Sequence, residues 1–246
     1  MGLVRGKSDK IDAHRIALFA SKNANALRLW QRPRQAIIEL KALSALRKRL
    51  LAIKMQLKVP LKETASFSTK GFNALLNQSC ATSTAAVEGD LKMVNSKIEE
   101  IVKEDEQLKR LFDIITSVKN IGSVIAIKLI TVTNEFKDFD NAGQLASFAG
   151  IAPFTYQSGT SLNSKGHISF YGNKELKALL HMASMGSIRF KGELKDYYIR
   201  KTGEGKHPYC VLNAIRNKLL KRIFSCVQAN RLYEENYTKR GRMHED

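Results

Sequence analysis

Apolar residues recur at helical spacing along most of the 246-residue chain. After Pro33, they step by three and four through residues 37–53, and a second periodic stretch covers 85–112. Residues 60–82, between these stretches, are rich in Ser, Thr and Asn and contain a proline and a glycine. The pattern predicts two helices joined by a turn or loop at 60–82, which pair as an antiparallel hairpin or coiled coil over 31–112.

Residues 114–150 predict two apolar helices separated by a tight turn at 120–122, then a short helix at 142–148. The layout is typical of a helix-hairpin-helix, in which turn amides and the next helix N-terminus hold a DNA phosphate. Asn120 stands where glycine is usual, and asparagine tolerates the left-handed backbone that such a turn requires. An ordinary packed hairpin explains the same pattern, so DNA contacts at Asn120, Gly122 and Ser123 are one of two interpretations.

Residues 148–189 begin with a loop rich in glycine and hydroxyl side chains. Ser158 precedes a glycine and is a candidate nucleophile, although a glycine-flanked serine is more often a turn residue. A helix is predicted to follow Gly172-Asn173, and a last amphipathic helix covers 209–233, with basic residues on its polar side. The candidate phosphate contacts in this region are Lys165, Lys174, Arg216 and Lys218.

The first 30 residues predict a polar turn and a helix capped by Ser8 or Asp9. Asp9 and Asp12 are three residues apart and therefore share one face at the start of this helix. Acidic residues there interact well with the helix dipole, which explains them without a ligand. The alternative is a pair of Mg²⁺ ligands, because this hard cation prefers carboxylate oxygens.

The amino-acid composition indicates the kind of partner that the protein binds. Lys and Arg number 41 against 23 Asp and Glu, a net charge of +18, which predicts a polyanionic partner such as nucleic acid. We expect no membrane segment, because no apolar run reaches spanning length. Three widely spaced cysteines fit reduced thiols in a cytoplasmic protein rather than a metal site.

Several motifs follow one another in a fixed order: KSDKIDAHRIA, SVKNIGSVIAIKLI, QLASFAGIAPFTYQSGTS, GHISFYGNKELKALLHMA and HPYCVLNAIRNKLL. Together they resemble the DEDD-type insertion-sequence transposases, the group that includes the Piv-type DNA invertases. The resemblance covers nearly the whole chain. It implies DNA transposition or recombination by an enzyme in which a coiled coil joins an RNase-H-like domain to a helical DNA-binding domain.

The resemblance also assigns roles to residues. The last two of four metal-binding acids match Asp9 and Asp12, which would bind Mg²⁺, and the Ser-Gly element matches Ser158 as nucleophile. The partners it implies are DNA, in several members a guide RNA, and further copies of the same protein. The first two acids have no match here, so we expect an N-terminally truncated copy with an incomplete metal site.

We therefore expect a mainly α protein. Its parts are a remnant of the RNase-H-like domain (1–30), the coiled-coil hairpin (31–112), a helical transposase domain with the helix-hairpin-helix-like turn (113–235) and a flexible tail (236–246). Two alternatives to an active recombinase are a non-catalytic remnant that binds DNA or RNA, and a helix-hairpin-helix repair factor that binds branched DNA.

Overall fold

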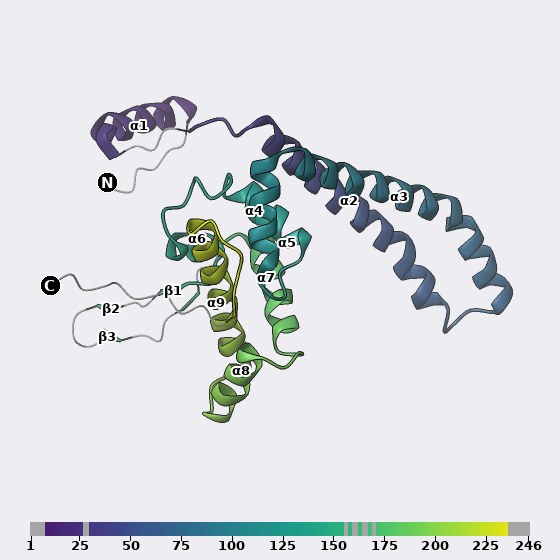
Figure 1. The fold of residues 1–246 in the computed structure, drawn as a ribbon. Coiled ribbons are helices and arrows are strands. Elements are labelled where there is room, and N and C mark those ends of the chain that lie inside the picture. The colour runs from purple at the N-terminus through teal and green to yellow at the C-terminus, as the bar shows by residue number, and fades with distance from the viewer. Residues whose placement is uncertain are drawn as a thin grey trace. The chain divides into compact units, whose positions relative to one another are not determined.

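The computed structural model describes residues 8–26, 30–154, 157–158, 162–163, 167–168 and 171–235. Within them the chain is mainly helical, as the sequence predicted (Figure 1). The α-helices are α1 (Asp9–Lys22), α2 (Gln35–Thr64), α3 (Lys70–Glu104), α4 (Glu106–Ser117), α5 (Ser123–Val132), α6 (Ala142–Phe148), α7 (Lys174–Ser187), α8 (Glu193–Gly203) and α9 (Pro208–Gln228). The chain divides into two compact units, residues 1–34 and 35–246, which are described separately. The predicted tail, 236–246, lies outside the described residues.

The first unit contains α1 and a single 3₁₀ turn, Ala24–Ala26. Ser8 is the N-cap, and its hydroxyl accepts a hydrogen bond from the Ile11 amide at 3.4 Å. Both acids of the first turn, Asp9 and Asp12, lie where the helix dipole favours negative charge. The predicted capped helix is therefore present, and its origin as part of an RNase-H-like domain stays a prediction.

The second unit begins with a long hairpin in which α2 and α3 run side by side (Figure 1). The predicted loop at 60–82 is wrong, because only residues 65–69 leave the helices. Pro60 lies within α2, and Asn77 and Ser79 direct their side chains to carbonyls one turn back in α3. These side chains thus bond to the helix itself, as polar residues in the middle of a helix can do.

A helix break at Asp105 corrects a second prediction. The sequence predicted one helix over 85–112, but α3 ends at Glu104 and α4 begins at Glu106. The backbone of Asp105 is extended, and its carboxylate accepts a hydrogen bond from the Leu108 amide at 2.9 Å. This N-cap redirects the chain, so the apolar face of α4 turns into the core of the unit, where Leu108 and Ile115 are fully buried.

The core of the second unit is built around α9, which packs against α4, α6, α7 and α8. α5 packs against α4 and α7 and also against α2, so it connects the long hairpin to this core. The side chains in the centre are branched aliphatic residues with no exposed surface, among them Leu129, Ile130, Leu176, Leu180, Ile215 and Leu219. No helix in the part of the chain that the structure describes has the length and apolar character that crossing a membrane requires.

An unusual turn ends α5. Asn134, Glu135 and Phe136 all have left-handed backbones, with φ of 49°, 59° and 65°. The Thr133 hydroxyl accepts a hydrogen bond from the Phe136 amide at 2.9 Å, and the Phe136 ring packs edge-on against Phe224 of α9. The surrounding core therefore holds a backbone conformation that these residues disfavour in isolation.

The residues described between α6 and α7 include four two-residue strands. β1 (Pro153–Phe154) pairs antiparallel with β4 (His167–Ile168), and β2 (Gln157–Ser158) pairs antiparallel with β3 (Leu162–Asn163). The two pairings are nested, as in a β-hairpin, where the sequence predicted a loop. The described strands contain Ser158, and we call these four strands together the Ser158 hairpin.

Candidate nucleic-acid interface

The base of the Ser158 hairpin is fixed by a close backbone contact. Gly150 follows α6 with a left-handed φ of 66°, which turns the chain toward β1. In the segment that returns to α7, a Cβ placed on Gly172 would lie 2.3 Å from the Gly150 Cα. The Asn173 amide then donates to the Phe148 carbonyl at 2.7 Å. Only glycine fits at Gly172, so the two ends of the hairpin are held together where it leaves the helical core.

Two asparagines of α9 donate hydrogen bonds to the backbone at the same base. Asn213 donates its side-chain amide to the Ile151 carbonyl at 2.8 Å, and Asn217 donates to the same oxygen at 3.3 Å. The two residues are one helical turn apart and thus lie on one face of α9. Because α9 is the central helix of the core, the hairpin emerges from a rigid support.

The structure describes the backbone position of Ser158, the predicted nucleophile. Ser158 is in β2, paired with Leu162 of β3. The neighbouring candidate Lys165 lies outside the described residues. Lys174 is exposed at the start of α7, next to Asn173, whose side chain caps that helix by accepting from the Leu176 amide at 2.9 Å. The sequence prediction of a helix starting after Gly172-Asn173 is confirmed.

The turn between α4 and α5 has the predicted backbone. Asn120 has a left-handed φ of 67°, and Gly122 is the N-cap of α5. The first amides of a helix have no partner within it, and Gly122 offers no side chain to cap them. The Ile125 amide is hydrogen-bonded to the Gly122 carbonyl at 3.1 Å, so Ser123 and Val124, the first two residues of α5, have the amides that can face an anion. Gly186 of α7 lies close to the Asn120 side chain, which supports the turn.

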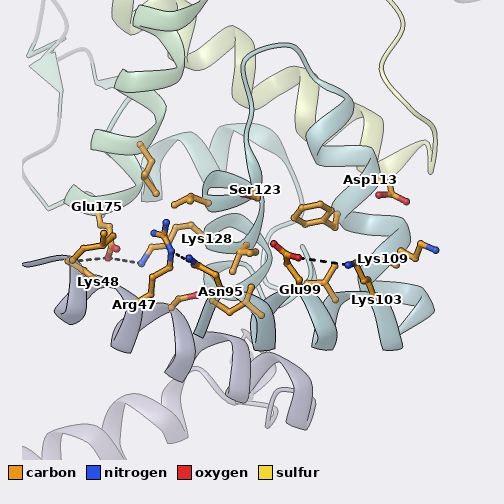
Figure 2. Close-up of a pocket in the computed structure, with 18 residues that line it drawn as sticks. Arg47, Lys48, Asn95, Glu99, Lys103, Lys109, Asp113, Ser123, Lys128 and Glu175 are labelled. Carbon is orange, nitrogen blue, oxygen red and sulfur yellow. Dashed lines mark hydrogen bonds and ion pairs between the residues drawn. The ribbon is translucent and has the colours of Figure 1, made fainter. Parts of the chain in front are cut away.

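A cleft of about 740 Å³ opens beside this turn, where α2 and α3 meet α4, α5 and α7 (Figure 2). Ser123 and Val124, the first residues of α5, are among the residues that line it. Five basic residues line the cleft, Arg47, Lys48, Lys103, Lys109 and Lys128, against three acidic ones, Glu99, Asp113 and Glu175. The positive excess and the helix N-terminus together suit a phosphate group.

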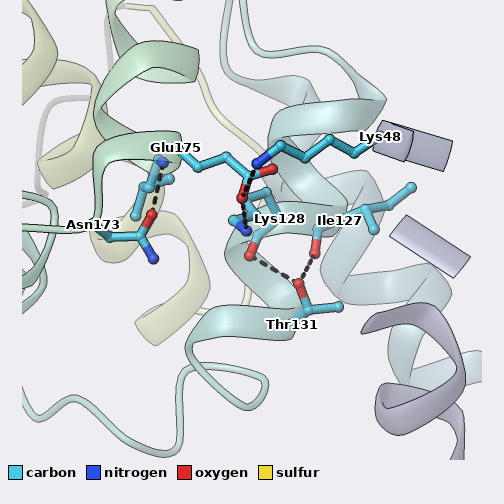
Figure 3. Close-up of polar contacts among 7 residues, drawn as sticks. Lys48, Ile127, Lys128, Thr131, Asn173 and Glu175 are labelled. Atoms are coloured by element: carbon cyan, nitrogen blue, oxygen red, sulfur yellow. Dashed lines mark hydrogen bonds and ion pairs between the residues drawn. The ribbon is translucent and has the colours of Figure 1, made fainter. Parts of the chain in front are cut away.

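Glu175 connects two of these basic side chains. Figure 3 shows its carboxylate between Lys128, at 2.7 Å, and Lys48, at 3.4 Å. The hydrogen bond from Lys128 is the main reason that the pKa of Glu175 lies below its ordinary value, although partial burial opposes the shift. The ion pairs join α2, α5 and α7, so they tie the long hairpin to the core on one side of the cleft.

The basic face predicted for the last helix is partly wrong. Arg216 points inward and is only 8% exposed, so it does not belong to the polar side of α9. Lys218 is on the surface, 4.0 Å from Glu193 and 4.7 Å from the centre of the Tyr197 ring. Arg216 falls on the apolar repeat Leu212, Leu219 and Ile223, and this spacing was the sequence signal for its burial.

Asp9 and Asp12 lie in the first unit, at the start of α1. Asp12 is 3.6 Å from the Arg15 guanidinium, a surface pair within α1. Among the residues described, no three His, Cys, Asp or Glu side chains gather as a metal site. Two carboxylates on one face fit a hard cation such as Mg²⁺ as a part of its ligand set.

Lys103, Lys109 and Lys128 were not predicted to line one cleft. They are on α3, α4 and α5, so no local motif joins them, and only the break at Asp105 brings the helices together. The basic run at Arg47 and Lys48 was noticeable in sequence as a cluster of charge.

Comparison with known proteins gives consistent matches. Residues 112–199 match the family model described as the transposase IS116/IS110/IS902 family. A pilin gene-inverting protein of Moraxella lacunata is 27% identical over 236 residues, which cover 94% of this chain and 69% of that protein. Uncharacterized proteins of two insertion elements also match: the IS116 protein of Streptomyces clavuligerus is 28% identical over 128 residues, and the IS110 protein of Streptomyces coelicolor is 27% identical over 157. The alignments cover 49% and 63% of this chain, and 32% and 37% of those two proteins.

Proposed function

Because the chain belongs to the transposase and invertase family of IS110, IS116 and the pilin gene-inverting proteins, we propose that it takes part in cutting and rejoining DNA strands, with Ser158 as nucleophile. The observation that carries the proposal is the support of the Ser158 hairpin. Gly150, Gly172 and the two asparagines of α9 fix its base, so β2 is attached to a rigid core. A nucleophile needs such support, since catalysis depends on orientation.

In the proposed reaction, the Ser158 Oγ forms a bond to the phosphorus of a DNA phosphodiester, and one phosphorus–oxygen bond of the strand breaks. The hydroxyl proton passes to a base, and the leaving sugar oxygen takes up a proton. Attack by a sugar hydroxyl on the serine phosphodiester then reverses these steps and joins a new strand. The number of phosphodiester bonds is conserved, so the exchange needs no external energy source.

Asp9 and Asp12 are the chain's candidates for holding Mg²⁺, as a pair of carboxylates at the start of α1. When bound, this cation stabilises negative charge that develops on the phosphate. In this proposal the two aspartates contribute part of the ligand set, and other ligands complete it. The basic cleft and the α5 N-terminus, with Asn120, Gly122 and Ser123, hold the DNA backbone. Lys165, Lys174 and Lys218 would contact further phosphates, and a guide RNA and a homo-oligomer belong to the same proposal.

A trapping experiment tests this function. The full chain is incubated with Mg²⁺ and nicked DNA from the ends of its mobile element, so that the leaving strand diffuses away and a covalent intermediate accumulates. We expect a protein–DNA adduct with the wild-type chain and none with Ser158→Ala. Ser161→Ala, three residues further along the sequence, is the matched control and should retain the adduct. An adduct that persists in Ser158→Ala and disappears in Ser161→Ala would contradict the assignment.

The basic cleft favours a second function, non-catalytic binding of DNA or RNA, because binding there requires neither Ser158 nor a metal ion. It predicts salt-sensitive DNA binding by the wild-type chain without any adduct. Charge reversal at Lys109→Glu, which lines the cleft, should weaken that binding. The same trapping experiment, combined with a binding titration, therefore separates the two functions.

A further inference from the structure

Three polar side chains with an unpartnered buried atom lie on α7 and α9, two helices that pack against each other. Arg216 and Asn213 come from α9, and His181 comes from α7. Each has one atom that is sealed from solvent and has no hydrogen-bond partner: the Arg216 Nε, the Asn213 Oδ1 and the His181 Nδ1. Two of these residues, Arg216 and Asn213, are more than nine-tenths buried, at 8% and 9% exposed.

Arg216 is the unusual member of this group. Buried guanidinium groups are normally paired with a carboxylate, since an uncompensated buried charge is costly. Among the described residues, no ion pair or hydrogen bond involves Arg216. Burial lowers the pKa of this arginine, and no neighbouring carboxylate opposes that effect. The Nε of this cation is thus sealed in the interior without a partner, and the two terminal nitrogens of the guanidinium are not among the sealed atoms.

The chain segment that contains the Ser158 hairpin has no acidic residue that could pair with Arg216. Asn213 holds the Ile151 carbonyl at the hairpin base, and Arg216 is three residues further along the same face of α9. No aspartate or glutamate occurs between Asp140 and Glu175, the whole stretch that contains the hairpin. Glu175 itself is engaged by Lys128 and Lys48. An anion at Arg216 is therefore expected to come from a bound molecule.

His181 fits such a ligand. Burial lowers the pKa of its imidazole, and the nearby Arg216 charge lowers it further. The neutral ring keeps one N–H donor and does not add a second buried positive charge beside Arg216. The pair thus offers donors from two helices with a single positive charge, which matches one phosphodiester oxygen.

We propose that Arg216 and His181 form a binding site for one phosphate group of a nucleic acid, beneath the hairpin that carries Ser158. The inference rests on the proposed function for the identity of the ligand. A phosphate held there would place the strand against the base of the hairpin, where Asn213 already fixes the backbone. Arg216 and His181 act as positioning residues, and Ser158 keeps the chemical role.

The test replaces the guanidinium with an apolar side chain of similar length, Arg216→Met. Because the sealed Nε has no hydrogen-bond partner, removal of the guanidinium should leave the melting temperature of the free protein unchanged or higher. DNA binding should weaken about tenfold, and the slope of log K against log salt should fall in magnitude by about one. Arg222→Met is the matched control on α9; its guanidinium is paired with Glu193, so we expect a smaller change in slope.

A second measurement needs no DNA. Sodium phosphate, compared with sodium chloride at equal ionic strength, should raise the melting temperature of the wild-type chain. It should raise that of Arg216→Met and His181→Leu less or not at all. A phosphate-specific shift that Arg216→Met abolishes supports the site even if no Ser158 adduct forms, in which case the proposed function fails separately. An equal phosphate shift in wild type and Arg216→Met, together with an unchanged salt slope, would overturn the site.

Discussion

Substitution of Gly172 by alanine probes the contact that closes the base of the Ser158 hairpin. The new Cβ would lie 2.3 Å from the Gly150 Cα and 2.5 Å from the Gly150 nitrogen. Both neighbours are backbone atoms, so no side-chain rotation can relieve the overlap. Ordinary carbon–carbon contacts lie at about 3.5–4.0 Å, and the two chain segments at Gly150 and Gly172 must therefore separate by more than about 1 Å.

The cost follows from this displacement. Overpacking in a well-packed region destabilises a protein by about 1–3 kcal/mol. The hydrogen bond from the Asn173 amide to the Phe148 carbonyl, now 2.7 Å, would also lengthen beyond hydrogen-bonding range. Its loss adds about 0.5–1.5 kcal/mol. We expect Gly172→Ala to lower the free energy of unfolding by about 2–4 kcal/mol in total.

Urea denaturation monitored by circular dichroism measures this change, with thermal melting as a second probe. Gly89→Ala is the control, because Gly89 lies inside α3 and a Cβ added there would meet no atom within 4 Å. Alanine there should stabilise the protein by about 0.5–1 kcal/mol through helix propensity. If Gly172→Ala costs less than about 0.5 kcal/mol, the close backbone contact does not hold the hairpin base.

Three further substitutions test other contacts. Glu175→Gln removes the carboxylate whose pKa is lowered mainly by Lys128. The wild-type pair stabilises the fold above the ordinary glutamate pKa and loses this effect as the pH falls through the lowered pKa, so the variant should lack this pH dependence. At neutral pH the variant should lose at most about 1 kcal/mol of unfolding free energy, because the pair is half-exposed; urea titrations across pH measure this, and an unchanged pH profile would refute it. Asn213→Ala leaves the Ile151 carbonyl without its shorter hydrogen bond and should lower the free energy of unfolding by about 1–3 kcal/mol in denaturation experiments. An unchanged free energy of unfolding would contradict this role of Asn213. Asp105→Ala removes the N-cap of α4 and should cost about 0.5–2 kcal/mol, whereas Asp105→Asn should retain most of that stability.

Features that depend on local chemistry were predictable from the sequence. The short helix at 142–148 was predicted with the bounds that the structure has, because Asn141 and Gly150 mark its two ends. The left-handed turn at Asn120 followed from the tolerance of asparagine for that backbone. The order of motifs pointed to the transposase and invertase family, which the comparisons support.

Features that depend on packing were not predictable in this way. The polar residues of 60–82 looked like a loop, but their side chains bond back to the helix, and the pairing of α2 with α3 outweighs weak propensity. The cleft combines lysines from three helices, and their proximity exists only in the folded chain. The burial of Arg216 broke the rule that charges face solvent, and that exception is the basis of the phosphate site.

The left-handed turn after α5 has a consequence for the order of folding. Glu135 and Phe136 each disfavour this backbone by about 1–2 kcal/mol, and a contact that helps to offset the cost joins Phe136 to Phe224, far away in sequence. The turn should therefore close only after α9 has docked, late on the folding pathway. Phe136→Leu should accelerate unfolding and leave the refolding rate nearly unchanged in stopped-flow experiments. A slower refolding rate would instead place this turn in the folding nucleus, so that α5 and α9 would come together first.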